Sequence, residues 1–239
     1  MGGGSDRLVA VVTGASRGIG AGLVAGYRAQ GWAVVANAQD IKPSDDPAVL
    51  TVAGDISEPA TADRIVTGAL ERFGRIDTLV NNAGVFIGKP FTDYTTEDYQ
   101  LVVRVNLTGF FLMTQRVITV MLKGGGGHIV NISTTMAEHA NSSSPALLAT
   151  LTKGGLVAAT KSLAIEYASR GIRANAVSLG VIQTPPNPPE AFAALAKLHP
   201  VGHVGQVSDV VAGILYLESA APFVTGEILH IDGGQSAGC

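Results

Sequence analysis

Short apolar runs alternate with longer segments of helical spacing along almost the whole chain. The runs lie at 8–12, 33–36, 50–53, 77–81, 128–133, 174–179 and 227–231 and are rich in Val, Ile, Leu and Ala. Such runs are typical of strands that a parallel sheet buries on both faces. The segments with helical spacing lie at 19–30, 61–73, 97–121, 149–169, 190–198 and 208–217, the last capped by Ser208. This alternation, without a repeat or a linker, predicts one α/β domain over 1–239 with a doubly wound parallel sheet.

The composition narrows the class of protein. Hydrophobic residues make up 46% of the chain and charged residues 15%, which favours a compact domain over a disordered one. The net charge is −3 and the basic residues are scattered, so we expect neither a nucleic-acid partner nor a membrane partner. No apolar run reaches membrane-spanning length. Residues 1–6 are expected to form a flexible leader that lacks the pattern of a signal peptide.

Cysteine and histidine usage bears on location and on metals. The only cysteine is Cys239, so no disulfide forms within the chain; this fits a reducing cytosol and predicts a cytoplasmic location. His199 and His203 have no cysteine or carboxylate cluster at metal-ligand spacing, so no metal site is expected.

A glycine-rich turn separates the first strand from the first helix. Gly14, Gly18 and Gly20 allow the backbone to approach a phosphate closely, and the N-terminus of the following helix favours an anion. Because a strand precedes the turn and a helix follows it, the motif predicts a Rossmann-type dinucleotide site rather than an ordinary turn.

The end of the second strand bears on the choice of cofactor. A carboxylate there would bind the ribose of NAD, whereas a basic side chain would bind the 2′-phosphate of NADP. Ala38 is neither, Asp40 lies further along, and Arg17 in the glycine turn is long enough to reach a 2′-phosphate. NADP(H) is therefore favoured, with NAD(H) as the other candidate. The alternative interpretation is that Arg17 forms an ion pair on the surface.

The order and spacing of further motifs resemble the short-chain dehydrogenase/reductase (SDR) family over almost the whole chain. They are Thr13-Gly-x-x-x-Gly-Ile-Gly20, Asp55, Asn81-Asn-Ala-Gly84, Val105-Asn106-Leu107, Ile129-Val-Asn-Ile-Ser133, Arg173-x-Asn175-x-Val177, Gly180-x-Ile182-x-Thr184, Thr225-Gly226 and Asp232-Gly233-Gly234. The resemblance implies an oxidoreductase with a nicotinamide cofactor and a substrate lid over about 184–203, opened by prolines at 185, 186, 188 and 189. It also implies a homotetramer or homodimer that pairs through the helices at 97–121 and 149–169.

The cofactor contacts implied by this resemblance come from both halves of the chain. They are Gly14, Ser16, Arg17, Gly18, Ile19, Gly20, Asn37, Asp55, Ile56, Asn82, Ala83, Gly84, Lys153, Gly180, Ile182 and Thr184. Asp55 would accept a hydrogen bond from the adenine amino group, although it is equally suited to capping the helix that starts near Pro59. Asn81 would steady the central strand.

The candidate catalytic residues are Ser133, Thr134, Asn106 and Lys153. In the family a hydroxyl polarises the substrate carbonyl, a Tyr transfers the proton, and a Lys four residues later binds the nicotinamide ribose and lowers the pKa of the Tyr from about 10. Thr134, preceded by Ser133, matches the hydroxyl, and Lys153 matches the lysine. Asn106 matches the residue that holds a water linked to that lysine; the alternative interpretation is that it bonds a neighbouring backbone group.

The tyrosine of this pattern is missing from the sequence. The residue four positions before Lys153 is Ala149, and no Tyr lies between Tyr99 and Tyr167. A proton could then come from a water held by Lys153 and Asn106, or from the imidazole of a loop histidine, or be unnecessary for the substrate. That histidine is His139; its neighbours Glu138 and the serines at 142–144 are interpreted as ordinary loop residues.

We therefore expect hydride transfer between a nicotinamide cofactor and a small carbonyl or alcohol by a non-standard proton route. Two other functions stay open from the sequence. One is a cofactor-binding protein without redox activity, either a sensor or a structural subunit. The other is a lyase or hydrolase on the same scaffold.

Overall fold

The structure is a computed structural model that describes residues 7–140, 144–185 and 189–238. The predicted leader at 1–6, Ser142, Ser143 and the prolines at 186 and 188 lie outside the described residues.

Seven parallel strands form the central sheet, in the order β3-β2-β1-β4-β5-β6-β9. The strands are β1 (Val9–Thr13), β2 (Ala33–Ala38), β3 (Val49–Ala53), β4 (Thr78–Asn81), β5 (Gly127–Thr134), β6 (Ile172–Leu179) and β9 (Ile228–Ile231). The order runs in one direction from β1 to β3 and in the other from β4 to β9, which opens a crevice at the carboxyl ends of β1 and β4. The predicted Rossmann-type doubly wound sheet is confirmed.

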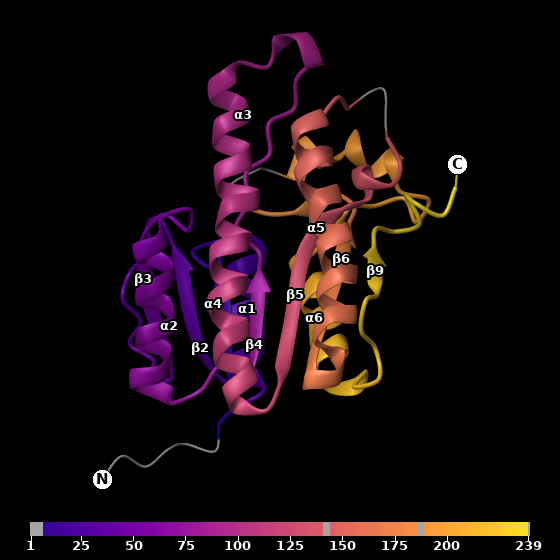
Figure 1. The fold of residues 1–239 in the computed structure, drawn as a ribbon. Helices are drawn as coiled ribbons and strands as arrows, with labels where there is room; N and C mark the ends of the chain where they lie inside the picture. Colours follow the sequence, from indigo (N-terminus) through magenta and orange to yellow (C-terminus); the bar gives the residue numbers. More distant parts are fainter. Residues whose placement is uncertain (1–6, 141–143, 186–188, 239) are drawn as a thin grey trace.

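Helices cover both faces of the sheet (Figure 1). α1 (Gly18–Ala29) and α6 (Val207–Leu215) pack on one face, and α2 (Pro59–Phe73), α4 (Gly109–Gly124) and α5 (Leu147–Tyr167) pack on the other. The apolar strand residues meet apolar helix residues in two buried clusters, one on each face.

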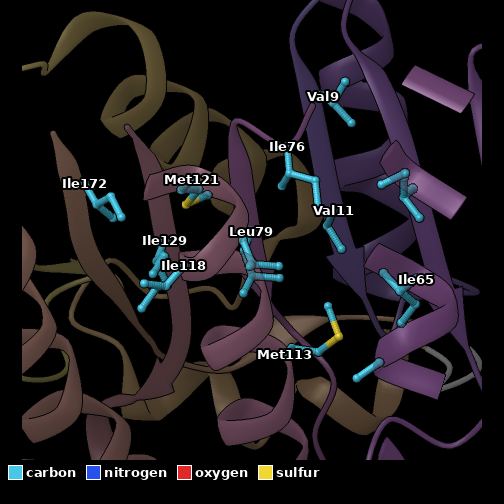
Figure 2. Close-up of a cluster of buried hydrophobic side chains, with 14 of the residues drawn as sticks. Val9, Val11, Ile65, Ile76, Leu79, Met113, Ile118, Met121, Ile129 and Ile172 are labelled. Carbon is cyan, nitrogen blue, oxygen red and sulfur yellow. The ribbon is translucent and has the colours of Figure 1, made fainter. Parts of the chain in front are cut away.

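The cluster beneath α2 and α4 shows how the sheet is held (Figure 2). Val11 of β1 and Leu79 of β4 lie among Ile65 of α2 and Met113 and Met121 of α4, and all of them are fully buried. Each such side chain contributes roughly 1.5–3 kcal/mol when it is buried. This packing fixes the strands relative to one another, so the loops at their carboxyl ends start from fixed positions.

The helix predicted at 97–121 contains an irregular turn. It consists of α3 (Thr96–Val103), a π-helical turn η2 (Arg104–Thr108) and α4, and Asn106 lies in the π-helical turn. π-helical turns insert one extra residue and often occur at functional sites. Periodicity alone could not reveal this turn, because it changes the helical spacing by only one residue.

The same segment contradicts the expectation that no apolar run reaches membrane-spanning length. Residues Thr96–Gly124 are long and apolar enough to cross a membrane by length and composition, with 39% of the most apolar window buried. The inner side of α4, with Met113, Val117 and Met121, packs on the sheet. Packing in the domain core therefore accounts for the apolar residues on that side.

Two predictions about the last third of the chain are wrong. Residues 190–198 form two short 3₁₀ turns, η5 (Pro189–Phe192) and η6 (Leu195–Leu198), rather than one helix. α6 is capped by Gln206, not Ser208: the backbone N–H of Gln206 donates to the carboxylate of Asp209 at 2.8 Å. In a capping box the acidic residue lies three positions after the cap residue. Asp209 lies three positions after Gln206 and only one after Ser208, so Gln206 is the cap.

The remaining short elements were not predicted. They are η1 (Phe91–Asp93), η3 (Thr135–Ala137), η4 (Ala168–Arg170), a π-helical turn η7 (Tyr216–Ala220), and the two-residue strands β7 (Ile182–Gln183) and β8 (Gly205–Gln206). β7 and β8 pair in parallel and join the start of the predicted lid to its end.

Candidate active site

A groove with a volume of about 470 Å³ lies at the carboxyl ends of β1, β2, β3 and β4. It is lined by most of the predicted cofactor residues, namely Gly14, Ser16, Arg17, Gly18, Ile19, Gly20, Asn37, Asp55, Ile56, Asn82, Ala83, Gly84 and Thr184. Leu101, Arg104, Val105 and Pro185 also line it and were not predicted. Lys153, Gly180 and Ile182 are not among its lining residues.

The glycine turn leaves backbone where side chains would collide. A Cβ on Gly20 would lie 2.1 Å from the carbonyl oxygen of Gly14, and a Cβ on Gly14 would lie 2.9 Å from Cα of Ala83. Gly14 and Gly18 also have φ of 66° and 54°, a region that side chains disfavour. The turn therefore presents its bare backbone to the groove at the N-terminus of α1, which suits the diphosphate of a dinucleotide.

The turn after β4 holds the glycine turn in place. The side-chain amide of Asn82 donates to the carbonyl oxygens of Thr13 at 2.8 Å and Gly14 at 3.1 Å. In return, the hydroxyl of Thr13 accepts hydrogen bonds from the backbone N–H groups of Asn82 and Ala83. Thr13 was not among the predicted site residues, although its hydroxyl joins the two loops that form the floor of the groove.

Beyond the end of β3, Asp55 is engaged by neighbours. Its Oδ1 accepts hydrogen bonds from the backbone N–H of Ser57 at 2.9 Å and from the hydroxyl of Ser57 at 2.6 Å. Burial alone would raise the pKa of Asp55, but the hydrogen bonds from Ser57 outweigh it and lower the pKa below 3.8. Arg104 lies 3.4 Å from the other carboxylate oxygen. Asp55 is therefore ionised, and α2 begins after Glu58 without a side-chain cap.

Two of the predicted cofactor residues, Asn37 and Arg17, differ in exposure. Asn37 is buried, and its amide donates to the carbonyl oxygens of Val52 and Gly54, so this side chain joins β2 to the end of β3. Arg17 is exposed and lines the groove. Of the two, Arg17 is the side chain that lies open to a ligand.

A row of buried polar side chains crosses the middle of the sheet. The amide of Asn81 donates to the hydroxyl of Thr114 at 3.0 Å and to Oδ1 of Asn131 at 2.9 Å. The amide of Asn131 then donates to the hydroxyl of Thr160 at 2.8 Å. These bonds tie β4 and β5 to α4 and α5, which agrees with the expected role of Asn81 in steadying the central strand.

Asn106 is nearly saturated with hydrogen bonds. Its Oδ1 accepts from the backbone N–H of Val85 at 2.8 Å, and its amide donates to the carbonyl oxygen of Val85 and the hydroxyl of Thr152, each at 3.1 Å. Both amide hydrogens are used, so one lone pair of Oδ1 is left to accept a further bond.

The lysine lies beside Asn106. Lys153 Nζ donates to the carbonyl oxygen of Ile132 at 2.7 Å, and burial lowers its pKa to about 8. A Cβ on Gly84 would lie 3.1 Å from Nζ of Lys153 and 3.3 Å from Oδ1 of Asn106. Gly84 lines the groove, so the ammonium group and the amide oxygen both lie beside one of its lining residues.

The two hydroxyls after β5 have different surroundings. The hydroxyl of Ser133 is buried and donates to the carbonyl oxygen of Lys153 at 3.1 Å, so it holds α5 against the strand. Thr134 is partly exposed, and its hydroxyl accepts from the backbone N–H of Met136 at 3.4 Å. The hydrogen of the Thr134 hydroxyl remains available to a substrate, which makes Thr134 the better candidate of the pair.

The position of the missing tyrosine is buried. Ala149 lies in the first turn of α5 and is 4% exposed, and its carbonyl oxygen accepts from the hydroxyl of Thr152 at 3.3 Å. His139 is exposed in the loop after β5. Glu138 is held by the imidazole of His230 at 3.1 Å, so its carboxylate is directed to β9.

Gly180 and Ile182 lie in the turn between β6 and the lid. The N–H of Gly180 donates to the carbonyl oxygen of Ile231 at 3.1 Å, and Ile182 pairs with Gly205 in the two-residue strands. This turn leads to Thr184, whose side chain packs on Gly18 across the groove. Within the described ranges, no group of three His, Cys, Asp or Glu side chains is placed to hold a metal ion.

Comparisons with known proteins agree with this geometry. The family model described as Enoyl-(Acyl carrier protein) reductase matches residues 14–236. The 3beta-hydroxysteroid dehydrogenase 1 of Eggerthella lenta is 36% identical, over 95% of this chain and 92% of its own. The 3-ketoacyl-(acyl-carrier-protein) reductase from Brucella melitensis, solved with NADH, is 32% identical with a TM-score of 0.88, over 96% of this chain and 98% of its own.

A further solved structure, ElxO with NADP bound, is 26% identical with a TM-score of 0.90, over 97% of this chain and 100% of its own. The bare glycine turn, the groove and the ionised Asp55 fit a nicotinamide dinucleotide of the kind these two structures hold. The chain belongs to the short-chain dehydrogenase/reductase family of NAD(P)-dependent oxidoreductases.

Proposed function

We propose that the protein is an NADP(H)-binding oxidoreductase that transfers hydride between the nicotinamide and a small carbonyl or alcohol without a tyrosine acid. The observation that carries the proposal is that Lys153 Nζ and Asn106 Oδ1 both lie next to Gly84, a residue that lines the groove. The names of the relatives, a hydroxysteroid dehydrogenase and a ketoacyl reductase, support a carbonyl or alcohol substrate.

Three candidate catalytic residues, Lys153, Thr134 and Ser133, would each have a part in this reaction. When bound, the nicotinamide supplies or accepts the hydride. Lys153 would hold the nicotinamide ribose, and the hydroxyl of Thr134 would donate a hydrogen bond to the substrate oxygen. Ser133 acts indirectly, because its bond to the carbonyl oxygen of Lys153 fixes α5 relative to β5.

The proton would come from Lys153 through a water. The ammonium group has three hydrogens and one of them is used by Ile132. Asn106 has one acceptor position left, so a water between them would bind both. In the direction of reduction, that water gives a proton to the substrate oxygen as hydride reaches the carbon, and Lys153 replaces it. His139 is a weaker candidate, because it is exposed in the loop after β5, whereas Lys153 and Asn106 both lie next to Gly84.

The test is turnover of carbonyl substrates by the purified protein with NADPH and NADH, followed by nicotinamide absorbance. Lys153→Ala is the matched control. Activity that depends on Lys153 supports the proposal, and absence of any turnover above the control refutes it. Product formation without an absorbance change would instead indicate a lyase or hydrolase.

One specific observation favours a second candidate. Ala149 occupies the position of the family's proton donor, and losing such a donor typically costs on the order of a hundred- to ten-thousand-fold in rate. A cofactor-binding sensor or structural subunit would tolerate that loss. This candidate predicts binding of the dinucleotide with no turnover on any carbonyl or alcohol.

The preference for NADP(H) rests on Arg17. Arg17 is exposed at the groove, while Asp40 is not among the residues that line it. Calorimetric titration with NADPH and NADH tests this: Arg17→Ala is expected to weaken NADPH binding and leave NADH binding nearly unchanged. An equal effect on both would remove the basis for the preference.

We further propose that the protein forms a homotetramer or a homodimer and lies in the cytoplasm. The outer sides of α4 and α5 carry exposed apolar side chains, with Phe111 56%, Leu151 54% and Ile165 86% exposed. Light scattering on the purified protein measures the assembly, and Ile165→Arg should reduce it if these helices pair. Fractionation of cells that express the chain tests its location.

A further inference from the structure

His199 is a buried histidine whose two ring nitrogens are both engaged. Its Nε2 accepts a hydrogen bond from the backbone N–H of Val181 at 3.0 Å, and its Nδ1 lies 3.0 Å from the carbonyl oxygen of Leu195. A backbone N–H can only donate and a carbonyl oxygen can only accept. The partners therefore assign the proton to Nδ1 and the lone pair to Nε2.

The first partner belongs to the turn that leads into the groove. The N–H of Gly180 donates to Ile231, the carbonyl oxygen of Val181 accepts from the N–H of Gly205 at 2.9 Å, and the N–H of Val181 donates to His199. A Cβ on Gly180 would lie 2.7 Å from Nε2 of His199, so the turn and the ring are in close contact.

A movement of this turn would be transmitted to the groove through Thr184. β7 (Ile182–Gln183) follows Val181 directly, and Thr184 comes next. A Cβ on Gly18 would lie 3.3 Å from the methyl carbon of Thr184, so Thr184 packs against the glycine turn. A shift of the Val181 peptide would move Thr184 relative to Gly18.

The second partner belongs to the predicted lid. Leu195 begins η6 (Leu195–Leu198), and the N–H of His199 donates to the carbonyl oxygen of Ala196 at 3.1 Å. The carbonyl oxygen of His199 accepts from Gly202 at 2.8 Å. One ring thus joins the described part of the lid to the turn that carries Thr184.

We infer that His199 is a positioning residue that couples the lid segment Leu195–Leu198 to the nicotinamide end of the cofactor groove. The inference rests on the proposed function, in which the groove holds a nicotinamide dinucleotide. A substrate that binds the lid would then change the affinity for the dinucleotide, and the dinucleotide would change the affinity for the substrate by the same factor.

The test compares His199→Leu and His199→Gln, with His203→Leu as the matched control, because His203 is exposed four residues away. Calorimetry measures binding of whichever of NADP⁺ and NAD⁺ binds the wild type more tightly, and of the matching ADP-ribose fragment, which lacks nicotinamide. His199→Leu should weaken the dinucleotide on the order of tenfold, because the buried N–H of Val181 loses its acceptor. The fragment should bind as before, and His203→Leu should match the wild type.

His199→Gln separates position from simple loss of packing. A glutamine side-chain oxygen can accept the N–H of Val181, so this variant should recover part of the affinity that His199→Leu loses. Equal weakening of dinucleotide and fragment, or unchanged binding of both, would overturn the inference.

Two measurements need no ligand. Nitrogen NMR should find the His199 proton on Nδ1, and the amide of Val181 should exchange with solvent faster in His199→Leu than in the wild type. A proton on Nε2, or unchanged exchange, would overturn the coupling. Failure of the wild type to bind any dinucleotide, with the NMR results as expected, would refute the proposed function instead.

Discussion

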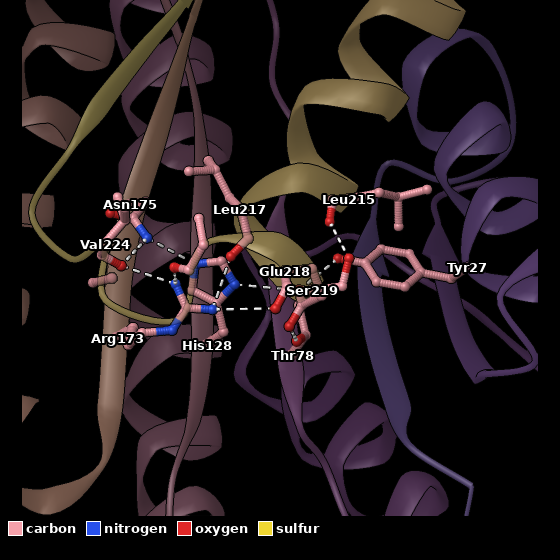
Figure 3. Close-up of polar contacts among 12 residues, drawn as sticks. Tyr27, Thr78, His128, Arg173, Asn175, Leu215, Leu217, Glu218, Ser219 and Val224 are labelled. Carbon is pink, nitrogen blue, oxygen red and sulfur yellow. Dashed lines mark hydrogen bonds and ion pairs between the residues drawn. The ribbon is translucent and has the colours of Figure 1, made fainter.

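The carboxylate of Glu218 lies 3.2 Å from Nδ1 of His128 in the interior of the protein (Figure 3). His128 lies at the start of β5, so this pair is at the opposite end of the sheet from the groove. The hydroxyl of Thr78 donates to the same carboxylate at 2.8 Å, and that of Tyr27 at 3.0 Å. Burial opposes ionisation of Glu218, but the hydrogen bond with His128, followed by those from Thr78 and Tyr27, outweighs it and holds the pKa of Glu218 below its usual 4.5. The carboxylate is therefore ionised and satisfied by its neighbours.

The other side of the His128 ring determines its charge. The amide of Asn175 lies 3.0 Å from Nε2 of His128 and also donates to the carbonyl oxygen of Val224. Its oxygen accepts from the N–H of Glu227, so the amide cannot turn over without losing bonds. Nε2 must accept, and the ring is neutral. Burial, together with the nearby guanidinium of Arg173, lowers the pKa of His128 below its usual 6.5 despite the Glu218 carboxylate.

We predict that, as the pH falls, acid destabilises the fold through His128 before Glu218 titrates. Below pH 6.5 the unfolded chain binds a proton at His128 and the folded chain does not, so the free energy of unfolding falls as the pH falls. The slope is at most about 1.4 kcal/mol per pH unit from this one group. Below about pH 4.5 the depressed pKa of Glu218 adds a loss of the same sign.

Urea unfolding at pH 8, 7, 6 and 5 measures this slope. His128→Gln should flatten it between pH 6.5 and 5, whereas His203→Gln, an exposed control, should leave it unchanged. Parallel profiles for His128→Gln and the wild type would contradict the assignment of a neutral buried histidine.

A second prediction concerns the missing tyrosine. Ala149→Tyr places a phenol four residues before Lys153, where the family has its proton donor. If hydride transfer is limited by the proton, the turnover number should rise by about a hundredfold or more. Because Ala149 is buried, the larger side chain is expected to cost about 1–3 kcal/mol of stability through overpacking.

The matched control for this change is Ala149→Phe, which adds the same ring without the hydroxyl. It should show the loss of stability and no gain in turnover. Equal turnover in Ala149→Tyr and Ala149→Phe would mean that the added ring changes the rate by altering the shape of the pocket, and that proton donation by the hydroxyl does not.

Sequence reasoning was strongest where one physical rule decides the outcome. Buried parallel strands need continuous apolar runs, and a phosphate-binding turn needs glycines, so β1, β4 and Gly20 were all predictable. It was weakest where a side chain has two plausible partners. Asn37 was expected at the cofactor; it lines the groove, but its amide also bonds the end of β3, and only the tertiary structure shows that second role.

Two further features could not have been read from the chain. The π-helical turn that carries Asn106 depends on how α3 and α4 meet the loop after β4, through bonds to Val85. The role of His199 depends on a contact between residues 18 positions apart across the lid. Neither leaves a local pattern, because both arise from packing between elements.

A third prediction follows from the burial of Lys153. Its pKa is lowered to about 8, so the ammonium form that donates a proton is lost as the pH rises through that value. The rate of carbonyl reduction should therefore fall above about pH 8, and the rate of alcohol oxidation should rise there. Rate profiles from pH 6 to 10 measure both. Lys153→Arg keeps its charge to much higher pH, so its reduction rate, although lower, should not fall near pH 8. A fall near pH 8 that persists in Lys153→Arg would have to come from another group.

The last prediction tests the glycine turn as a phosphate site. A Cβ on Gly20 would lie 2.1 Å from the carbonyl oxygen of Gly14, a contact that backbone cannot relieve without moving the turn. Gly20→Ala should therefore weaken dinucleotide binding by about a hundredfold or more, because the N–H groups at the start of α1 no longer meet the diphosphate.

Gly124→Ala is the control: it lies in the last turn of α4, and nothing is within 4 Å of its Cβ. It should bind the dinucleotide normally and be equally stable or slightly more stable, since alanine is a better helix former than glycine. Calorimetry gives the affinities and thermal unfolding the stabilities, and normal binding by a folded Gly20→Ala protein would show that the diphosphate lies elsewhere.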